Sequence, residues 1–383
     1  MPADPVVRLP RLQARPFRGW RYVQPDATHA LSGLMQRVLS ADAPDSATEV
    51  ASSLRGWRER GLLVQDTEPS FYVYRGEFEG HSVVGVVCGI SVHPPGDGVV
   101  LPHEGVSDRM VARQARLMTI MNGQPEPVVT VRRGGRPMRS VLGGLLQRAP
   151  AAHFLDAAGR HSVWRVHDPH LVRALEAVID GSRLLLADGH HRHAAYRRLG
   201  HRLGLAMVVD DGEEGLRLGA IHRVLPAVRI DAITATPGVR VTHLGSGPGH
   251  AVRVHRSRRA DAPADTCRVS DGQDVWQVEP TTRAHGSAPL AVPDLAVSRL
   301  HAQWLPRWGV AETEIAYVHD ADEAVAQAAA SGGLAVLMPR PRIDAVFDTA
   351  LRGELLPAKA TSFRPKPPIG LVLRHWPDGD EDR

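Results

Sequence analysis

The 383-residue chain is poor in several residue types, and each shortage narrows the class of protein. It has only two cysteines, Cys88 and Cys267, which are too few for a disulfide framework or a zinc knuckle and favour a reduced, cytoplasmic protein. Aromatic residues make up 5% of the chain, so the basic stripe with neighbouring aromatics that marks nucleic-acid binding is not expected. No run of about 18 apolar residues occurs, so no membrane span or membrane partner is predicted. The first residues lack the apolar stretch of a secretory signal.

Lysine is scarce, and its placement is uneven. Arginine supplies almost all of the positive charge, whereas the only two lysines, Lys359 and Lys366, stand close together in ELLPAKATSFRPKPPIGL. A lysine ammonium is a compact point charge, whereas an arginine guanidinium is larger and planar. The two lysines therefore either mark positions where a compact charge is needed or reflect sequence drift. The net charge of +4 is small, and the charged residues of both signs are mixed along the chain, which disfavours nucleic acid as a partner.

The chain does contain alternating strand and helix patterns, which predict a mixed α/β fold. A hairpin is expected over 69–92 with Gly80 in its turn, and Ser107 or Asp108 is expected to cap a helix. Further strands are predicted over 128–131, 161–168, 183–188, 205–211 and 334–339, and helices over 30–39, 47–61, 108–121, 169–180, 294–305, 320–333 and 343–354.

The length of the chain predicts more than one domain. Residues 1–97 are assigned to an N-terminal α/β part, 98–226 to a core domain and 227–383 to a C-terminal α/β domain. From about residue 236 the sequence becomes rich in Gly, Ala and turn residues, as in TPGVRVTHLGSGPGHAVRVH, which indicates a boundary or a more loosely built domain nearby.

The stretch LLLADGHHRHAAYRRLG, residues 184–200, carries the densest set of candidate functional side chains. His190, His191 and His193 are a poor zinc set, because neighbours on a helix point apart and no cysteine or carboxylate stands at a standard spacing. A strand, a turn at Gly189 and a following helix would instead direct backbone N–H groups and the positive end of a helix dipole at an anion.

Arg192 falls in the first turn of that predicted helix, and its guanidinium can grip phosphate oxygens through two N–H groups. The sequence therefore favours a phosphate-binding turn. A tight turn with solvated histidines stays open as the alternative.

The motif DGHHRHAAYRRLG resembles the D-G-H-H-R-x-x-A element of the free serine kinases, a relative of the phosphate-gripping turns of the chromosome-partitioning ParB proteins and of sulfiredoxin. Upstream, LPHEGVSDRMVARQARLMTIMNGQPEPVVTV resembles the serine-kinase order of H-E-x-V, helix, glycine and strand. This resemblance implies a ParB/sulfiredoxin-like mixed-sheet core over 98–226, flanked by N- and C-terminal α/β parts.

Segments spread over nearly the full length are also similar to a larger family, the domain of unknown function DUF1015. They are RPFRGWRY, FYVYRGEF, LPHEGV, VWRVHD, LADGHHRHAA, IHRVLP and GELLPAKATSFRPKPPIGLV. Two features depart from that family: the P-P-Y-D-V segment that usually follows RPFRGWRY is missing, and His193 stands where tyrosine is common.

The serine-kinase resemblance implies a phosphotransferase that acts on free serine or another small hydroxyl compound. Glu104 would be the general base, because a partly desolvated carboxylate near phosphates has a raised pKa. His103 would orient Glu104 or contact the phosphate. Asp188 would hold Mg²⁺ or cap the turn, with ATP or ADP as the expected nucleotide and no structural metal site.

Two further segments complete the expected site. His222 and Arg223 of AIHRVL either bind phosphate or pack in the core, and Lys359 adds a positive charge. The predicted phosphate- or nucleotide-binding residues are Asp188, Gly189, His190, His191, Arg192, His222, Arg223 and Lys359.

Two other functions stay open. A ParB-like nucleotide-binding switch requires a partner or nucleic-acid surface, which the charge pattern does not supply. A non-catalytic relative would keep the fold and bind no nucleotide. The expected partners are a small-molecule substrate and a nucleotide, a homo-oligomer is left open, and the sequence selects neither the phosphoryl donor nor the acceptor.

Overall fold

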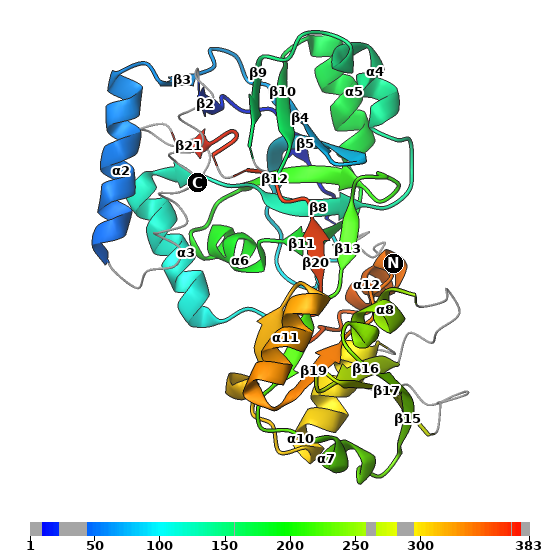
Figure 1. The fold of residues 1–383 in the computed structure, drawn as a ribbon. Helices are drawn as coiled ribbons and strands as arrows, with labels where there is room; N and C mark the ends of the chain where they lie inside the picture. Colours follow the sequence, from blue (N-terminus) through cyan, green and yellow to red (C-terminus); the bar gives the residue numbers. More distant parts are fainter. Residues whose placement is uncertain are drawn as a thin grey trace, which may run out of the picture. The chain divides into compact units, whose positions relative to one another are not determined.

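The computed structural model describes residues 10–22, 44–156, 158–257, 266–281, 295–368 and 370–376. It confirms a mixed α/β fold, which forms two compact units (Figure 1). The first unit contains residues 1–102, 106–217 and 365–383, and the second contains 103–105 and 218–364. The three-part division expected from the sequence stays a prediction, and the helix expected over 30–39 lies outside the described residues.

A nine-stranded mixed sheet organises the first unit, in the order β6-β11-β8-β12-β5-β4-β10-β9 with β1 added against β5. The β11–β6 and β12–β8 pairs are parallel, and the other pairs are antiparallel. The strands are β1 (Ala14–Arg15), β4 (Phe71–Phe78), β5 (His81–Ser91), β6 (Val100–Pro102), β8 (Val128–Arg132), β9 (Ala152–Leu155), β10 (Arg160–Val166), β11 (Leu184–Asp188) and β12 (Leu203–Asp210).

Helices and two short ribbons complete this unit. The helices are α2 (Pro44–Glu59), α3 (Asp108–Met121), α4 (Arg139–Leu146), α5 (Pro169–Ile179) and α6 (His190–Arg198). The ribbons pair β2 (Trp20–Tyr22) with β3 (Leu63–Gln65) and β7 (Gly123–Gln124) with β21 (Arg374–His375). The start of α5 follows a common pattern, because Pro169 occupies its first turn and the Asp168 carboxylate accepts from the backbone N–H groups of His170 and Leu171.

The core of the first unit lies along the central strands. Val86, Val128 and Val208 have no exposed surface, as expected for strands covered on both faces. On α3, Ala115 and Met118 join the same cluster, which confirms the inward face expected from the helical spacing. The predicted hairpin is also confirmed: β4 and β5 pair, and Gly80 has the positive φ of 74° that their turn requires.

An antiparallel six-stranded sheet organises the second unit, in the order β15-β17-β16-β19-β14-β18. Its strands are β14 (His222–Leu225), β15 (Val239–Ser246), β16 (Cys267–Ser270), β17 (Asp274–Pro280), β18 (Ala316–Val318) and β19 (Leu334–Leu337), and a separate ribbon pairs β13 (Arg217–Gly219) with β20 (Ser362–Arg364). Its helical segments are α7 (Ile230–Thr234), α8 (His250–Arg256), α9 (Ala296–Arg299), a π-helical segment (Leu300–Trp304), α10 (Leu305–Arg307), a 3-10 turn (Glu312–Glu314), α11 (Ala321–Ser331) and α12 (Ile343–Leu351).

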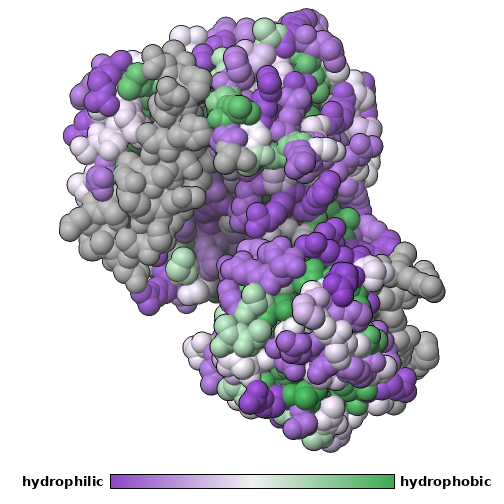
Figure 2. Space-filling view, in the orientation of Figure 1, coloured by the Kyte–Doolittle hydropathy of each residue, from purple (hydrophilic) through white to green (hydrophobic). Residues whose placement is uncertain are grey.

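Small side chains let α11 pack closely on this sheet. Ala324 and Ala328 have no exposed surface and belong to one cluster with Val275 and Ala335 of the strands. The view in Figure 2 is mostly polar, with hydrophobic residues in small patches. Across the described residues, no helix combines the length and the apolar character needed to cross a membrane.

Candidate functional site

The turn between β11 and α6 has the strand–glycine–helix form expected from the sequence. Gly189 has a φ of 92°, in the left-handed region that favours glycine, and α6 begins at the next residue. A Cβ atom at Gly189 would also lie 2.9 Å from the Val128 Cγ1 atom and 3.0 Å from Arg192 Nε. Both the backbone angle and the close packing therefore require glycine here.

Arg192 is buried beneath this turn and is bound by protein groups. Its Nη1 atom donates to the Pro127 carbonyl at 2.7 Å and lies 3.0 Å from a Glu126 carboxylate oxygen, while Nη2 lies 2.6 Å from Asp188 Oδ2. Burial alone would lower the pKa of Arg192, but the two carboxylates outweigh it and raise that pKa. The Arg192 guanidinium could form the expected pair of hydrogen bonds with a phosphate only if the phosphate displaced Glu126 or Asp188.

Asp188 lies between two cations. Its Oδ1 atom accepts from Lys366 Nζ at 2.6 Å, and its Oδ2 atom faces Arg192. Burial favours the protonated acid, but the attraction of Arg192 and Lys366 is stronger, so the pKa of Asp188 lies below its ordinary value. The contacts of Asp188 are thus with two cations, and the two roles considered for it, holding Mg²⁺ or capping the turn, stay predictions.

Glu126 is a member of this cluster that the sequence did not indicate. It stands just before β8 in the segment PEPVV, and burial raises its pKa while Arg192 opposes that rise. Its position between two prolines at the start of a buried strand could have marked Glu126 as a candidate. That local pattern does not indicate that its partner is Arg192, which lies 66 positions further along the chain.

The three histidines of α6 have separate surroundings. The Nε2 atom of His191 accepts from the Ser107 backbone N–H at 3.1 Å, and His190 is buried at the start of the helix. His193 is buried on another face, and burial lowers its pKa to about 4, with help from Arg197. Within the described ranges, no three His, Cys, Asp or Glu side chains are grouped as a metal site.

Glu104 belongs to the second unit, where the turn at residues 359–361 holds it. One of its carboxylate oxygens accepts from the Ala360 backbone N–H at 3.1 Å, and its side chain is 18% exposed. Burial raises the pKa of Glu104, although the backbone N–H groups of the turn and the charge of Lys359 oppose the rise. The result is a carboxylate that keeps some access to solvent and has a raised proton affinity.

His103 supports this arrangement. It has no exposed surface, and its Nε2 atom lies 2.7 Å from Thr361 Oγ1 and 3.9 Å from a Glu104 oxygen. The Leu356 backbone N–H donates to the His103 carbonyl at 2.7 Å. The orienting role considered for His103 fits these contacts better than direct contact with a phosphate.

Arg223 is fully buried in the same unit. Its guanidinium donates to the carbonyls of Ile221 and Lys359 and to His301 Nε2, and it lies 5.2 Å from the ring centre of Tyr317. In the described part of the chain no carboxylate forms an ion pair with it, and burial lowers its pKa to about 10. Arg223 is therefore a buried positive charge whose direct contacts are dipoles and an aromatic ring, while Glu104 and Glu312 attract it without forming an ion pair.

The remaining expected residues divide between structure and surface. His222 is buried, its Nδ1 atom accepts from the Met338 backbone N–H at 3.1 Å, and burial lowers its pKa to about 4, which fits the core role considered for it. Lys359 has an exposed side chain and a positive φ of 60°. Tyr317 and His301, which contact Arg223, were not found from the sequence because they lie about 80 or more positions away and no local pattern connects them to Arg223.

The expected residues thus fall into two groups. Asp188, Gly189, His190, His191 and Arg192 lie in the first unit, and His103, Glu104, His222, Arg223 and Lys359 lie in the second.

Residues 34–236 match the family model described as "Protein of unknown function (DUF1015)". The match covers more than half of the 383 residues, and the chain belongs to this family. The similarity to DUF1015 that was identified in the sequence is thereby confirmed. No curated protein matches the sequence.

Several solved structures are distantly similar. A conserved hypothetical protein from Pyrococcus furiosus is 14% identical with a TM-score of 0.35, covering 70% of this chain and 89% of that chain. A free serine kinase in complex with AMP is 13% identical with a TM-score of 0.36, covering 71% and 88%. SbnI with a C-terminal truncation, from Staphylococcus aureus, is 12% identical with a TM-score of 0.40, covering 73% and 86%. Likenesses at this level assign neither substrate nor reaction to this chain, and the ParB/sulfiredoxin label stays a prediction.

Proposed function

We propose that this protein is a nucleotide-dependent phosphotransferase that phosphorylates a small hydroxyl compound, with free serine as the leading acceptor and Glu104 as the general base. The observation that carries the proposal is the setting of Glu104: a partly buried carboxylate with a raised pKa, held by the backbone of residues 359–361. A general base works best when its pKa lies near the working pH, and burial moves a glutamate in that direction.

The charge around Glu104 supports chemistry on an anion. Arg223 is buried without a carboxylate partner in the described chain, and the exposed Lys359 ammonium acts on Glu104 as well. A buried charge that has no ion-pair partner exerts a strong field in a low-dielectric interior, and this field favours phosphate or carboxylate groups of a substrate nearby. Because Arg223 itself has no exposed surface, we assign it this electrostatic role and not a direct contact.

The turn at Gly189 is the proposed phosphate-binding element of the first unit. The amino end of a helix carries a partial positive charge, and α6 is nine residues long. Arg192 would position this turn through its bonds to Asp188 and Glu126. The residues do not fit a protein-held Mg²⁺, since both Asp188 oxygens already face cations, so the metal would arrive on the phosphates of ATP or ADP.

The proposed step begins when Glu104 accepts the proton of the acceptor hydroxyl. The hydroxyl oxygen then attacks the terminal phosphorus of the nucleotide, and the bond from that phosphorus to its bridging oxygen breaks. The bridging oxygen leaves with the remaining nucleotide, and the products are a phosphate monoester and a nucleotide shorter by one phosphoryl group. Deprotonation and charge stabilisation are the parts of this step that protein side chains supply.

The test is formation of phosphoserine from serine with ATP or ADP and Mg²⁺, followed by mass spectrometry. Replacing Glu104 by Gln keeps the size of the side chain and removes the base, so turnover should fall about 10²- to 10⁴-fold while nucleotide affinity is kept. Glu323→Gln, on the exposed face of α11, is the matched control and should retain wild-type turnover.

Two results would overturn the proposal. Nucleotide binding without any phosphorylated product from serine or other small alcohols would favour the nucleotide-binding switch. Absence of both binding and product would favour a relative that keeps the fold and has no catalytic activity.

A further inference from the structure

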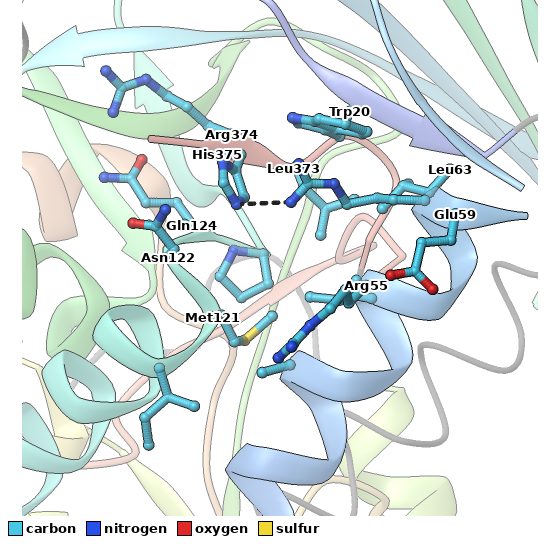
Figure 3. A pocket seen from close by; sticks show the side chains of 16 residues that line it. Trp20, Arg55, Glu59, Leu63, Met121, Asn122, Gln124, Leu373, Arg374 and His375 are labelled. Carbon is cyan, nitrogen blue, oxygen red and sulfur yellow. Dashed lines mark hydrogen bonds between the residues drawn. The ribbon is translucent and has the colours of Figure 1, made fainter. Parts of the chain in front are cut away.

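A separate cavity of about 590 Å³ lies in the first unit, where α2, the end of α3 and the β7–β21 ribbon meet (Figure 3). None of the residues expected from the sequence to form the site lines it. Its volume is within the range of small-molecule binding sites, about 300 to 1,000 Å³. The cavity therefore requires an explanation of its own.

Apolar side chains form much of the wall. Leu54 of α2, Met121 of α3 and Leu373 beside β21 line the cavity and belong to one hydrophobic cluster. Met121 is flexible and polarisable, which allows the wall to adapt to different apolar bodies. The wall is thus suited to a hydrocarbon or aromatic group.

The polar lining is mainly cationic. Arg55 projects from α2 toward the side where Met121 lies (Figure 3), and in the described chain its guanidinium has no hydrogen bond or ion pair. Arg58 is fixed by stacking 4.3 Å above the centre of the Trp20 ring and by donating to His375 Nε2 at 3.2 Å. Glu59 is the one carboxylate among the described lining residues, so arginines outnumber it.

From the apolar wall and this excess of arginine we infer that the cavity binds a small organic anion, with an aliphatic or aromatic body and a carboxylate or phosphate head group. The body lies against Leu54, Met121 and Leu373, and the head group meets Arg55. Arg58, held by Trp20 and His375, adds positive potential without having to reorganise. This ligand site is independent of the proposed phosphotransfer.

The test compares three probes of equal chain length by isothermal titration calorimetry below their micelle concentrations: decanoate, decanol and decylammonium. Decanoate should bind most tightly and decylammonium least. Arg55→Ala should weaken decanoate about three- to tenfold, as expected for loss of a charged hydrogen bond at a partly exposed site, and leave decanol unchanged. Arg60→Ala is the matched control, because Arg60 is an exposed arginine close by that does not line the cavity.

A second variant tests the position of the ligand. Ala51 of α2 lines the cavity and is half-buried, so Ala51→Phe should fill part of the space and weaken both decanoate and decanol. The inference is overturned if decanoate does not bind, if decylammonium binds as tightly as decanoate, or if Arg55→Ala and Arg60→Ala have the same affinity. Phosphoserine formation by Arg55→Ala should equal that of wild type, which separates this result from the proposed function.

Discussion

Arg192 and Arg223 are both buried arginines, one in each unit, and they differ in how their charge is compensated. Arg192 lies against two carboxylates and a carbonyl, and its pKa is raised. Arg223 lies against carbonyls, a histidine and a tyrosine ring, and its pKa is lowered to about 10. The same side chain therefore meets opposite electrostatic surroundings at a similar depth.

This difference in compensation indicates that the charge of Arg192 stabilises the fold, whereas the charge of Arg223 is suited to act on a ligand. Removing Arg192 breaks the ion pairs with Glu126 and Asp188 and leaves Asp188 with Lys366 alone, whereas removing Arg223 breaks no ion pair and takes away only its longer-range attraction to Glu104. A sequence motif that contains an arginine cannot distinguish these cases, because the partners of Arg192 and Arg223 are mostly distant in the chain. The following experiments test this contrast.

The largest effect is expected for Arg192→Ala. It should lower the free energy of unfolding by about 3–5 kcal/mol, since Glu126 is left without its cation and Asp188 keeps only Lys366. Urea denaturation followed by circular dichroism measures the change, and Arg197→Ala, exposed in the same helix, should stay within about 0.5 kcal/mol of wild type. An Arg192→Ala protein as stable as Arg197→Ala would mean that the two arginines do not differ as described.

Arg223→Met should have a smaller effect on stability. It removes a buried charge with no opposite partner but also leaves two carbonyls without a donor, so the free energy of unfolding should change by less than about 2 kcal/mol in either direction. Urea denaturation beside Arg192→Ala gives the comparison. A loss as large as that of Arg192→Ala would show that Arg223 is chiefly structural and would weaken its proposed electrostatic role.

Lys366→Met should have the smallest effect on stability. Lys366 forms an ion pair with Asp188, and its side chain is 55% exposed. Solvent-exposed ion pairs contribute about 0–1 kcal/mol to the free energy of unfolding. Lys359→Met, which changes the other lysine, serves as the control in the same denaturation experiment. A loss above about 2 kcal/mol for Lys366→Met would place Lys366 among the structural charges with Arg192.

The two carboxylates, Asp188 and Glu104, should affect stability with opposite dependence on pH. The lowered pKa of Asp188 gives a stabilisation that is present above its ordinary value of 3.8 and is lost as the pH falls through the folded pKa. The raised pKa of Glu104 gives a stabilisation that is present below its ordinary value of 4.5 and is lost as the pH rises through the folded pKa.

Denaturation series on Asp188→Asn and Glu104→Gln from pH 3 to pH 7 measure this difference. Relative to wild type, Asp188→Asn should lose stability as the pH rises toward 3.8, and Glu104→Gln should gain stability as the pH rises above 4.5. Two differences of the same sign would contradict the assigned directions. Because the base must be ionised, turnover should also fall as the pH is lowered through the folded pKa of Glu104.

The sequence predicted the elements whose patterns are local. The hairpin at Gly80, the start of α5 at Pro169 and the turn at Gly189 all depend on residues within a few positions of one another. The regular sheet formed by β15, β16 and β17 was not expected, because β15 is largely exposed and its Gly- and His-containing stretch resembles a loop. The helix α4 was also missed, since a loop was expected up to residue 140.

The site was predicted in its residue types and less well in its contacts. The motif drew attention to Asp188 and Arg192, but their bonds to Glu126 and Lys366 join positions that no local pattern connects. Glu104 was found through its resemblance to a family motif, whereas the backbone turn that holds it lies 256 positions further along the chain. Long-range pairing of this kind is set by tertiary packing, which a single sequence does not reveal.

The short pairing of β7 with β21 has a consequence for synthesis. Arg374 and His375 pair with Gln124 and Gly123, and the Trp20 N–H donates to the Leu373 carbonyl, so the last part of the first unit is made after the whole of the second. On the ribosome, domains generally fold in the order in which they emerge. Residues 218–364 are therefore complete while the earlier unit still waits for its closing strand, so a chain cut short after residue 364 would contain them and lack the strand that closes the earlier unit.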